Sequence, residues 1–311
     1  MKGLIQKQAV MNKVLWALAP LAVFGVFLFG WRVLAVLVVS NAAAFVTEWL
    51  FVRKKKPGKV SMAVFVTGTL MALTLPPTIP FWIAAVGSVV AIAFGKMVFG
   101  GFGANMFNPT IVGRTFLYIS FPEAMQLVWL KPFTSLPGGF AHWLRPENIT
   151  SATVLRDFVK RGVTDIPADF SLQNLSLGFV PGCAGETSAV LIVLAGVYLV
   201  VSKAAKWQPM VATLASFALF SWLLEPVSPL VTLTSGGILF GAVYMVTDPI
   251  SMPKNKTAIW IFGVLTGFLT VFIRRFSLFP EGFMFALLLA NTLTPIVEYG
   301  LDQMKKRGGK K

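Results

Sequence analysis

Cysteine, histidine and acidic residues are scarce in this chain of 311 residues. It contains one cysteine, Cys183, one histidine, His142, and only 12 acidic residues. A single cysteine excludes an internal disulfide, and it excludes a cysteine-ligated zinc or iron–sulfur site built by this chain alone. Because His142 stands apart from the cysteine and from any cluster of acids, we interpret it as a surface residue. We therefore predict no metal site.

Several functional motifs are also missing. The sequence has no Walker loop, dinucleotide glycine fingerprint, Ser/His/Asp set or haem motif, so we do not expect this chain alone to bind NADH. Apolar residues are abundant: 56% of the chain is hydrophobic, 13% is charged, and 28 residues are phenylalanine. With a mean hydropathy of +0.76, this composition is typical of proteins that cross a membrane many times.

Ten apolar segments are predicted to cross or enter the membrane, which makes the fold class an all-α integral membrane protein. The segments are 14–31, 33–52, 60–75, 81–99, 109–121, 186–201, 207–223, 228–247, 257–273 and 278–299. A full crossing needs about 20 apolar residues. We therefore interpret 60–75 and 109–121 as half or tilted helices. No small-residue cleavage site follows the first apolar run, so we do not expect a cleavable signal peptide.

The basic residues predict the topology. The net charge is +15, and most of the 27 lysines and arginines lie in connections that ten segments place on one side. These clusters are Lys2, Lys7 and Lys13; Arg53 to Lys56 with Lys59; Lys96; Lys203 and Lys206; Lys254 and Lys256; and Lys305 to Lys311. The positive-inside rule makes this side cytoplasmic, together with both termini. The charge therefore reflects topology and not nucleic-acid binding, and the long polar connection 122–180 is predicted to lie outside.

Prolines, glycines and asparagines interrupt the apolar runs between residues 60 and 121. The run VSMAVFVTGTLMALTLPPTIPFW carries three prolines, and GGFGANMFNPTIVGRTFLYISFP carries four glycines, two asparagines and two prolines. Broken helices leave backbone groups unpaired, and a membrane tolerates them only where they are buried in protein or line a polar cavity. The breaks therefore predict a binding or transport site near the midplane.

The two halves of the chain carry similar short strings. The run 104–112 resembles 290–297, with a shared A-N-x-x-x-P core, and the run 71–76 resembles 244–249. Five segments precede the long connection and five follow it, so the second half must enter the membrane upside down, as in inverted-repeat transporters. Chance recurrence of Asn-Pro and Thr-Pro breaks is the alternative. We predict membrane repeats at 1–121 and 181–300, the extracytoplasmic loop at 122–180 and a basic tail at 301–311.

Buried-looking polar residues mark the candidate site. Asp248, in a T-D-P break, either serves an ion or cofactor pathway or caps a helix end. Glu186, with Thr187 and Ser188, either presents a helix N-terminus to an anion or a polar ring edge, or favours the helix dipole. Arg114 needs an anionic partner.

The remaining candidates supply amides and a hydroxyl near the broken segments. Asn105 and Asn108 could recognise a flavin-like or uracil-like edge because an amide both donates and accepts. Thr74 and Asp248 complete the wall that we predict for a polar pocket at the paired breaks.

Four strings then carry a resemblance to a known family. GGFGANMFNPTIVGRTFLYISFP, TGTLMALTLPPTIPFW, PGCAGETSAVLIVLAG and YMVTDPISMP match in order, over about residues 10 to 300. They resemble the RnfD/NqrB family of flavin-carrying membrane subunits, and the chain length is most like the RnfD branch, which belongs to the Rnf complexes. The resemblance implies covalent FMN on a threonine outside, non-covalent riboflavin in the membrane, and one-electron transfer between them coupled to Na+ or H+ movement.

The same resemblance implies the attachment site. The family pattern is Asp-x-x-Ser/Thr-Gly-Ala-Thr/Ser, and the matching run here is 147–153. Thr150, Ala152 and Thr153 fit the pattern, whereas Glu147 and Ser151 depart from it. Thr153 is the expected FMN attachment residue, and Arg156 or Arg114 is the expected counter-ion of its phosphodiester.

The resemblance also implies partners and a location. The expected partners are a second flavin subunit of the RnfG type, iron–sulfur subunits, paired small membrane subunits and membrane lipid. The expected location is the bacterial cytoplasmic membrane. The residues alone leave a rival open, a channel or transporter for a small solute built on the same inverted plan without flavin. A purely structural scaffold is disfavoured by the breaks at membrane depth.

Overall fold

Helices dominate the computed structural model, which describes residues 4–54, 58–144, 149–150 and 170–308. The first half holds α1 (Ala9–Phe29), α2 (Arg32–Val52), α3 (Ala63–Leu73), α4 (Phe81–Ile92), the π-helix η1 (Ala93–Met97) and α5 (Pro109–Ser120). The connection holds α6 (Pro122–Gln126), β3 (Trp129–Leu130), the 3-10 helix η2 (Gly138–Ala141), β4 (Ile149–Thr150) and α7 (Leu172–Leu177). The second half holds α8 (Ala189–Val201), α9 (Trp207–Leu224), α10 (Pro229–Thr234), α11 (Ile238–Tyr244), α12 (Lys256–Phe276) and α13 (Phe283–Gly308).

The helices confirm an all-α integral membrane protein. Five of them, α1, α2, α9, α12 and α13, are long and apolar enough to cross a membrane, and α3, α4 with η1, and α8 are shorter apolar helices. At 1.5 Å per residue, the 11 residues of α3 and the 12 of α5 reach only about 16–18 Å of a core about 30 Å thick. This agrees with half helices at 60–75 and 109–121. The segment 228–247, predicted as one piece, is instead the two short helices α10 and α11.

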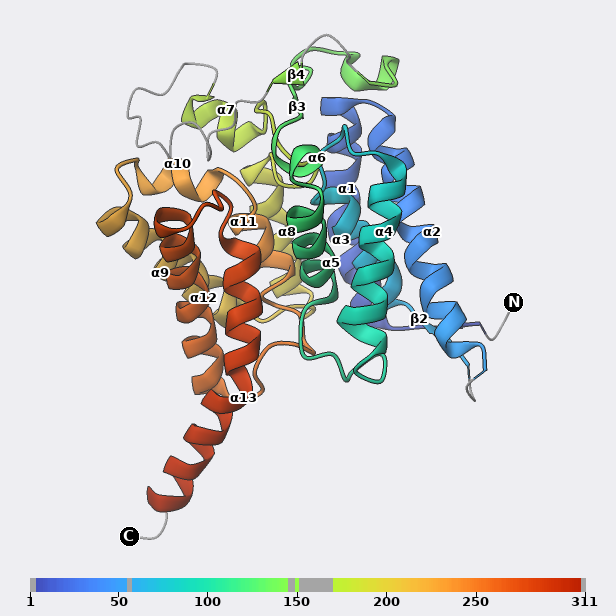
Figure 1. Cartoon of the computed structure of the whole chain (residues 1–311). Coiled ribbons are helices and arrows are strands. Elements are labelled where there is room, and N and C mark those ends of the chain that lie inside the picture. Colours follow the sequence, from blue (N-terminus) through green and yellow to red (C-terminus); the bar gives the residue numbers. More distant parts are fainter. Residues whose placement is uncertain (1–3, 55–57, 145–148, 151–169, 309–311) are drawn as a thin grey trace.

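Two ends of the bundle are distinct (Figure 1). The loop end carries α6, β3, β4, α7 and α10. The basic end carries β2, the connection between α4 and α5, and the C-terminal part of α13, which projects from the bundle. At the basic end β1 (Ile5–Gln6) pairs in parallel with β2 (Val60–Ser61), and this pairing ties the N-terminus to the start of α3.

The two halves repeat one packing order. In the first half α2 packs on α3 and α4, and α4 packs on α5; in the second half α9 packs on α11 and α12, and α12 packs on α13. The halves meet through α1 with α8 and α5 with α13. Close approach of α4 and α5 requires glycine, because a Cβ on Gly113 would lie 2.4 Å from the carbonyl oxygen of Gly87. The same order of packed helices therefore recurs in the two halves of the chain.

Buried basic residues occupy matching places in the two halves. Lys96, near the end of η1, bonds Glu48 near the end of α2 and Ser61 just before α3. Arg274, near the end of α12, donates to the carbonyl oxygens of Thr232 in α10 and of Ser235 between α10 and α11. Lys96 therefore joins η1 to the start of α3, and Arg274 joins the end of α12 to the connection before α11. Neither arrangement was predicted from the sequence.

The break after α3 is held by a cation. Arg32 donates to the carbonyl oxygens of Pro77 at 3.0 Å and Ile79 at 2.7 Å, and its guanidinium lies 4.5 Å from the ring of Phe81. These bonds satisfy backbone acceptors that the prolines leave outside any helix. The predicted disruption at 74–80 is thus built into the fold and stabilised by protein groups.

One part of the predicted repeat is wrong. The strings around Asn105–Pro109 and Asn291–Pro295 do not occupy equivalent places. Pro109 begins α5, whereas Pro295 lies inside α13, which continues to Gly308. The second similarity agrees better with the structure. Thr74 follows the short helix α3, and Thr247 follows the short helix α11. A shared proline spacing does not fix whether the chain breaks there, because helix packing can retain a proline within a long helix.

Candidate functional site

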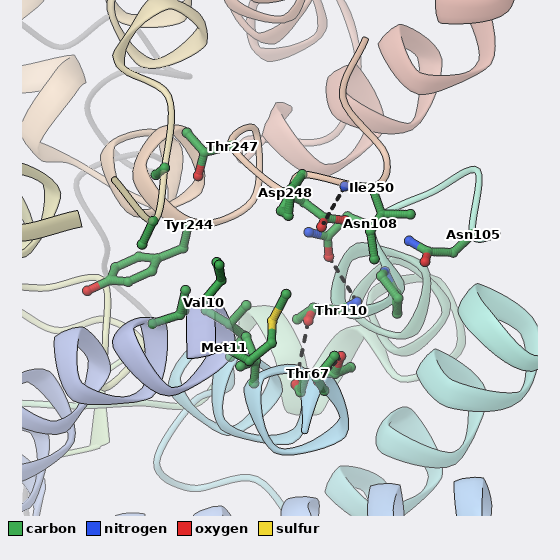
Figure 2. Close-up of a pocket in the computed structure, with 18 of the residues that line it drawn as sticks. Val10, Met11, Thr67, Asn105, Asn108, Thr110, Tyr244, Thr247, Asp248 and Ile250 are labelled. Atoms are coloured by element: carbon green, nitrogen blue, oxygen red, sulfur yellow. Dashed lines mark hydrogen bonds between the residues drawn. The ribbon is translucent and has the colours of Figure 1, made fainter. Parts of the chain in front are cut away.

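A cavity opens at the basic end, between the start of α5 and the break after α11. It measures about 60 Å³, and its polar lining includes Lys96, Thr67, Asn105, Asn108, Thr110, Thr247 and Asp248. Figure 2 labels all of these side chains except that of Lys96, with Tyr244 and Met11 on the wall formed by α11 and α1. The structure therefore brings three of the four predicted wall residues together.

Asn108 begins α5. Its Oδ1 accepts from the backbone N–H groups of Thr110 at 3.0 Å and Ile111 at 3.4 Å, and Pro109 takes the first helical position. Its Nδ2 donates to the carbonyl oxygen of Met245 at 3.4 Å, across to the other half. The N-P-T sequence thus folds as a capped helix start that joins the two broken segments.

Asp248 and Asn105 are more local in their contacts. Asp248 accepts from the N–H of Ile250 at 3.3 Å and the hydroxyl of Ser251 at 2.8 Å, so its carboxylate holds the turn after α11. Asn105 donates to the carbonyl oxygen of Phe107 at 3.1 Å. Of the two readings of Asp248, the structure shows the capping contacts directly, and it also places the residue in the cavity wall.

Thr74 lies apart from this cavity. It is fully buried, and its hydroxyl donates to the carbonyl oxygen of Met71 at 3.0 Å. The preceding residue, Leu73, accepts from the N–H of Gly185, next to Glu186. Thr74 therefore belongs to the neighbourhood of the PGCAGETS segment and does not join Asn105 and Asp248.

The basic-end cavity adjoins a larger groove of about 720 Å³, with Phe102, Ala204 and Ile250 in both linings. Gln8 and Gln208 lie in the lining of the groove, and one buried amide atom of each, Nε2 of Gln8 and Oε1 of Gln208, has no hydrogen-bond partner among the described residues. One is a donor and the other an acceptor. Buried unpartnered polar atoms are uncommon in folded proteins and call for an explanation such as a bound group.

A second cavity, of about 90 Å³, lies at the loop end. Its lining includes Arg114, Tyr118, Trp129, Glu186 and Thr187, along with Glu281 from the turn before α13. Arg114 is buried, donates to Glu186 at 2.5 Å and pairs with Glu281. The predicted need of Arg114 for an anionic partner is confirmed, and Glu281 is a partner that the sequence did not single out.

Thr187 and Ser188 play different parts beside Glu186. Ser188 is the N-cap of α8, and its hydroxyl oxygen accepts from the N–H of Leu191 at 3.4 Å. Thr187 is 4% exposed, and its Oγ1 has no hydrogen-bond partner in the described part of the chain. Glu186 and Thr187 both line the loop-end cavity, and the carboxylate of Glu186 faces Arg114.

The predicted attachment run falls almost wholly outside the described residues. Thr153 and Arg156 lie there, as do Glu147 and Ser151, whereas the backbone of Thr150 is described in β4. Thr150 pairs with Trp129 of β3 in antiparallel register. Since Trp129 lines the loop-end cavity, the backbone of Thr150 lies near that cavity.

Comparison with known proteins identifies the family. The model of the NQR2, RnfD, RnfE family matches residues 2–306. The chain belongs to this family. It is 34% identical over 305 residues to the D subunit of the proton-translocating ferredoxin:NAD(+) oxidoreductase complex of Clostridium ljungdahlii, covering 92% of this chain and 89% of that protein.

Two further relatives come from a sodium-translocating ferredoxin:NAD(+) oxidoreductase complex and from a sodium-translocating NADH-quinone reductase. The D subunit of the Na(+)-translocating ferredoxin:NAD(+) oxidoreductase complex of Acetobacterium woodii is 34% identical over 308 residues, covering 96% of this chain and 92% of that protein. The B subunit of the Na(+)-translocating NADH-quinone reductase of Chromohalobacter salexigens is 33% identical over 277 residues, covering 86% of this chain and 64% of that protein. Similar relatives are thus named for different coupling ions.

The basic-end groove has the size of a small-molecule site. Its volume lies within the range of about 300–1,000 Å³ found for such sites, which are mostly apolar with a few placed polar groups. The polar side chains in its lining include the amides of Gln8 and Gln208 and the ammonium groups of Lys203 and Lys206. Sequence reasoning missed Gln8 and Gln208 because neither lies in a broken segment.

Proposed function

We propose that this chain is the flavin-carrying membrane subunit of an Rnf-type, ion-translocating ferredoxin:NAD oxidoreductase complex. Support comes from family membership and from two similar D subunits, each named as part of a ferredoxin:NAD(+) oxidoreductase complex. Its task in this proposal is to hold two flavins, one at each end of the bundle, and to pass electrons between them singly. Bound flavin supplies the redox chemistry; the protein supplies position and polarity.

The non-covalent riboflavin is assigned to the basic-end groove. The observation that carries this assignment is the pair of buried, unpartnered amide atoms of Gln8 and Gln208 in a groove of suitable size. The neighbouring cavity with Asn105 and Asp248 extends the polar wall. A neutral ring needs no counter-charge. Lys96 can therefore remain bonded to Glu48 and Ser61 and need not bind an anion.

The covalent FMN is assigned to Thr153. Thr153 follows Thr150 by three residues, a span of at most about 11 Å of chain, and Thr150 pairs with Trp129 at the loop-end cavity. The attached phosphodiester keeps one negative charge. Arg114 already faces two carboxylates, so Arg156 is the better counter-ion of the two predicted.

The assembly and location complete the proposal. A multi-pass chain of this family would lie in the bacterial cytoplasmic membrane with both termini inside, as the basic clusters indicate. Its partners would be the other members of the complex: a flavin subunit of the RnfG type, iron–sulfur subunits and the paired small membrane subunits. The relatives' names, each of which specifies one subunit of a complex or reductase, support such an assembly.

The test is covalent flavin on the full chain, produced together with its flavin-attaching enzyme. Thr153→Val should abolish flavin fluorescence of the denatured protein in a gel, because the ester oxygen is lost. Thr150→Val is the matched control and should keep it. A flavin-free wild-type chain that conducts a small solute would instead support the channel rival, and fluorescence that persists in Thr153→Val would move the attachment elsewhere.

A further inference from the structure

The connection between α8 and α9 gives the basic-end groove its positive charge. The lining of the groove includes Lys203, Lys206 and Trp207 from this connection and the start of α9, and it includes no acid among the described residues. Neither lysine forms an ion pair within the part of the chain that the structure describes. One edge of the groove therefore carries two cations that the described chain does not neutralise.

Lys203 has a backbone conformation that is costly for a lysine. Its φ is +56°, and it is the only non-glycine residue with a positive φ among the described residues. Its N–H bonds the carbonyl oxygen of Val200 at 3.0 Å, and the N–H of Ala204 bonds that of Leu199 at 2.9 Å. This helix ending normally has glycine at the position of Lys203, because a Cβ disfavours the left-handed conformation. A lysine there calls for a reason outside the backbone.

The end of α8 does not supply that reason. A cation near a helix C-terminus is favourable because it faces the negative end of the helix dipole. Lys13 already takes this place, since its Nζ donates to the carbonyl oxygen of Ser202, the C-cap of α8, at 2.7 Å. The side chain of Lys203 is exposed. Its ammonium group is therefore available to a molecule bound at the groove.

The surroundings of the two lysines place them at the level of lipid headgroups. α8 is an apolar helix whose outer face exposes Val197 and, at its end, Val201. Trp207 begins α9 and packs edge-on against Trp260 at 5.7 Å, and both indoles are partly exposed. Tryptophan is enriched where membrane helices reach the interface with water. The cations thus lie where exposed apolar helix surface meets the interface.

We propose that this edge of the groove binds the phosphate of an anionic phospholipid. Lys203 and Lys206 donate to the phosphate oxygens, and the acyl chains lie along the outer face of α8. Basic pockets between membrane helices are suited to anionic headgroups. Free phosphate would use the lysines but not the apolar surface beside them, so the lipid is the occupant. The site goes beyond flavin carriage and does not depend on it, and the part of the groove that adjoins the smaller cavity is left for the flavin.

Native mass spectrometry of the purified full-length chain in detergent tests the proposal, with dioleoyl phosphatidylglycerol and dioleoyl phosphatidylcholine titrated separately. We expect the wild type to bind phosphatidylglycerol more tightly. Lys203→Gly and Lys206→Gln should each weaken its binding about fivefold, as expected for one lysine near an anionic headgroup. Lys254→Gln, an exposed lysine at the same end but outside the groove lining, is the matched control and should bind as the wild type does.

Lys203→Gly also separates lipid binding from folding. Glycine suits a positive φ, so the thermal unfolding midpoint of this variant should not fall. Weaker lipid binding by this variant then supports the proposal, because a damaged fold does not explain it.

Three results would overturn the proposal. The first is equal binding of the two lipids by the wild type, or unchanged phosphatidylglycerol binding in both folded lysine variants. The second is displacement of the lipid by excess inorganic phosphate, which would show that phosphate alone is recognised. The third is loss of riboflavin with unchanged lipid binding in the lysine variants, which would assign the lysines to the flavin. A flavin-free chain that still prefers phosphatidylglycerol would contradict the proposed function and support the lipid site.

Discussion

The basic end and the loop end solve the same problem, buried charge at a helix break, in different ways. At the basic end Lys96 bonds one carboxylate, Glu48, and the hydroxyl of Ser61, while the nearby Asp248 is held by the N–H of Ile250 and by Ser251. Each acid there has its own donors. At the loop end two carboxylates share the single guanidinium of Arg114.

The two arrangements differ in how each buried acid is neutralised. A buried pair with one donor for each acid closes a helix junction and leaves little reason to admit an ion. At the loop end Glu186 and Glu281 share Arg114, and the charge of Arg274 also faces them. The groove at the basic end is lined by the amides of Gln8 and Gln208 together with Lys203 and Lys206, and no acid stands among its lining residues. The two ends thus favour different ligands.

The first prediction tests which end faces which side. In a Cys183→Ser background, a membrane-impermeant thiol reagent on intact cells should label Leu136→Cys, since Leu136 is 82% exposed in the connection between β3 and η2. It should not label Lys206→Cys at the basic end until the cells are opened, because the basic clusters are cytoplasmic. Labelling in the opposite pattern would reverse the topology and place the attachment run inside.

The second prediction concerns the ion pair of Lys96 and Glu48. Lys96→Met should destabilise the folded chain by about 3–5 kcal/mol, because it leaves Glu48 buried without its cation. The thermal unfolding midpoint in detergent measures this. The double variant Lys96→Met with Glu48→Gln is the control and should recover most of the loss. Equal instability of the single and double variants would show that the pair does not act as a unit.

The third prediction concerns the basic-end groove. Gln208→Leu should lower the non-covalent flavin content of the purified chain about tenfold at limiting flavin, as expected for one lost hydrogen bond of about 1.4 kcal/mol. Asn105→Leu should have a smaller effect, because its amide already donates to Phe107. Gln173→Leu, exposed at the loop end, is the control. Unchanged extractable riboflavin in Gln208→Leu would remove the groove from the proposal.

The fourth prediction has the smallest effect and sharpens the contrast with Lys96. Glu281→Gln should change stability by about 1 kcal/mol or less, because Arg114 keeps Glu186 and the excess negative charge is removed. The same unfolding measurement compares it with Lys96→Met. A loss as large as that of Lys96→Met would mean that Glu281 is needed as a permanent counter-charge.

Local patterns in the sequence predicted where the helices break, but not which distant residues contact the breaks. The prolines at 76, 77 and 80 and the string N-P-T predicted interrupted helices, and the structure shows α3 ending at Leu73 and α5 beginning at Pro109. Both features are properties of neighbouring residues. Pro295 misled for the same reason, since a local proline gave no information about the packing that keeps α13 continuous.

Long-range pairs escaped prediction because helix packing sets them. Glu48 and Lys96 are 48 residues apart, and the packing of α2 on α4 and η1 brings them together. The charge of Arg114 predicted an acidic partner, and Glu186 was among the candidates. Glu281 follows α12, 167 residues after Arg114, so the sequence did not indicate it. Gln8 and Gln208 stand out only once the groove shows that their amide atoms lack partners.

The mass of the intact chain under denaturing conditions tests the central proposal most directly. When the chain is produced with its flavin-attaching enzyme, we expect the polypeptide mass increased by one FMN less one water, and the increase should vanish in Thr153→Val. A wild-type chain with the mass of the unmodified polypeptide would contradict a flavin-carrying role based on attachment through Thr153.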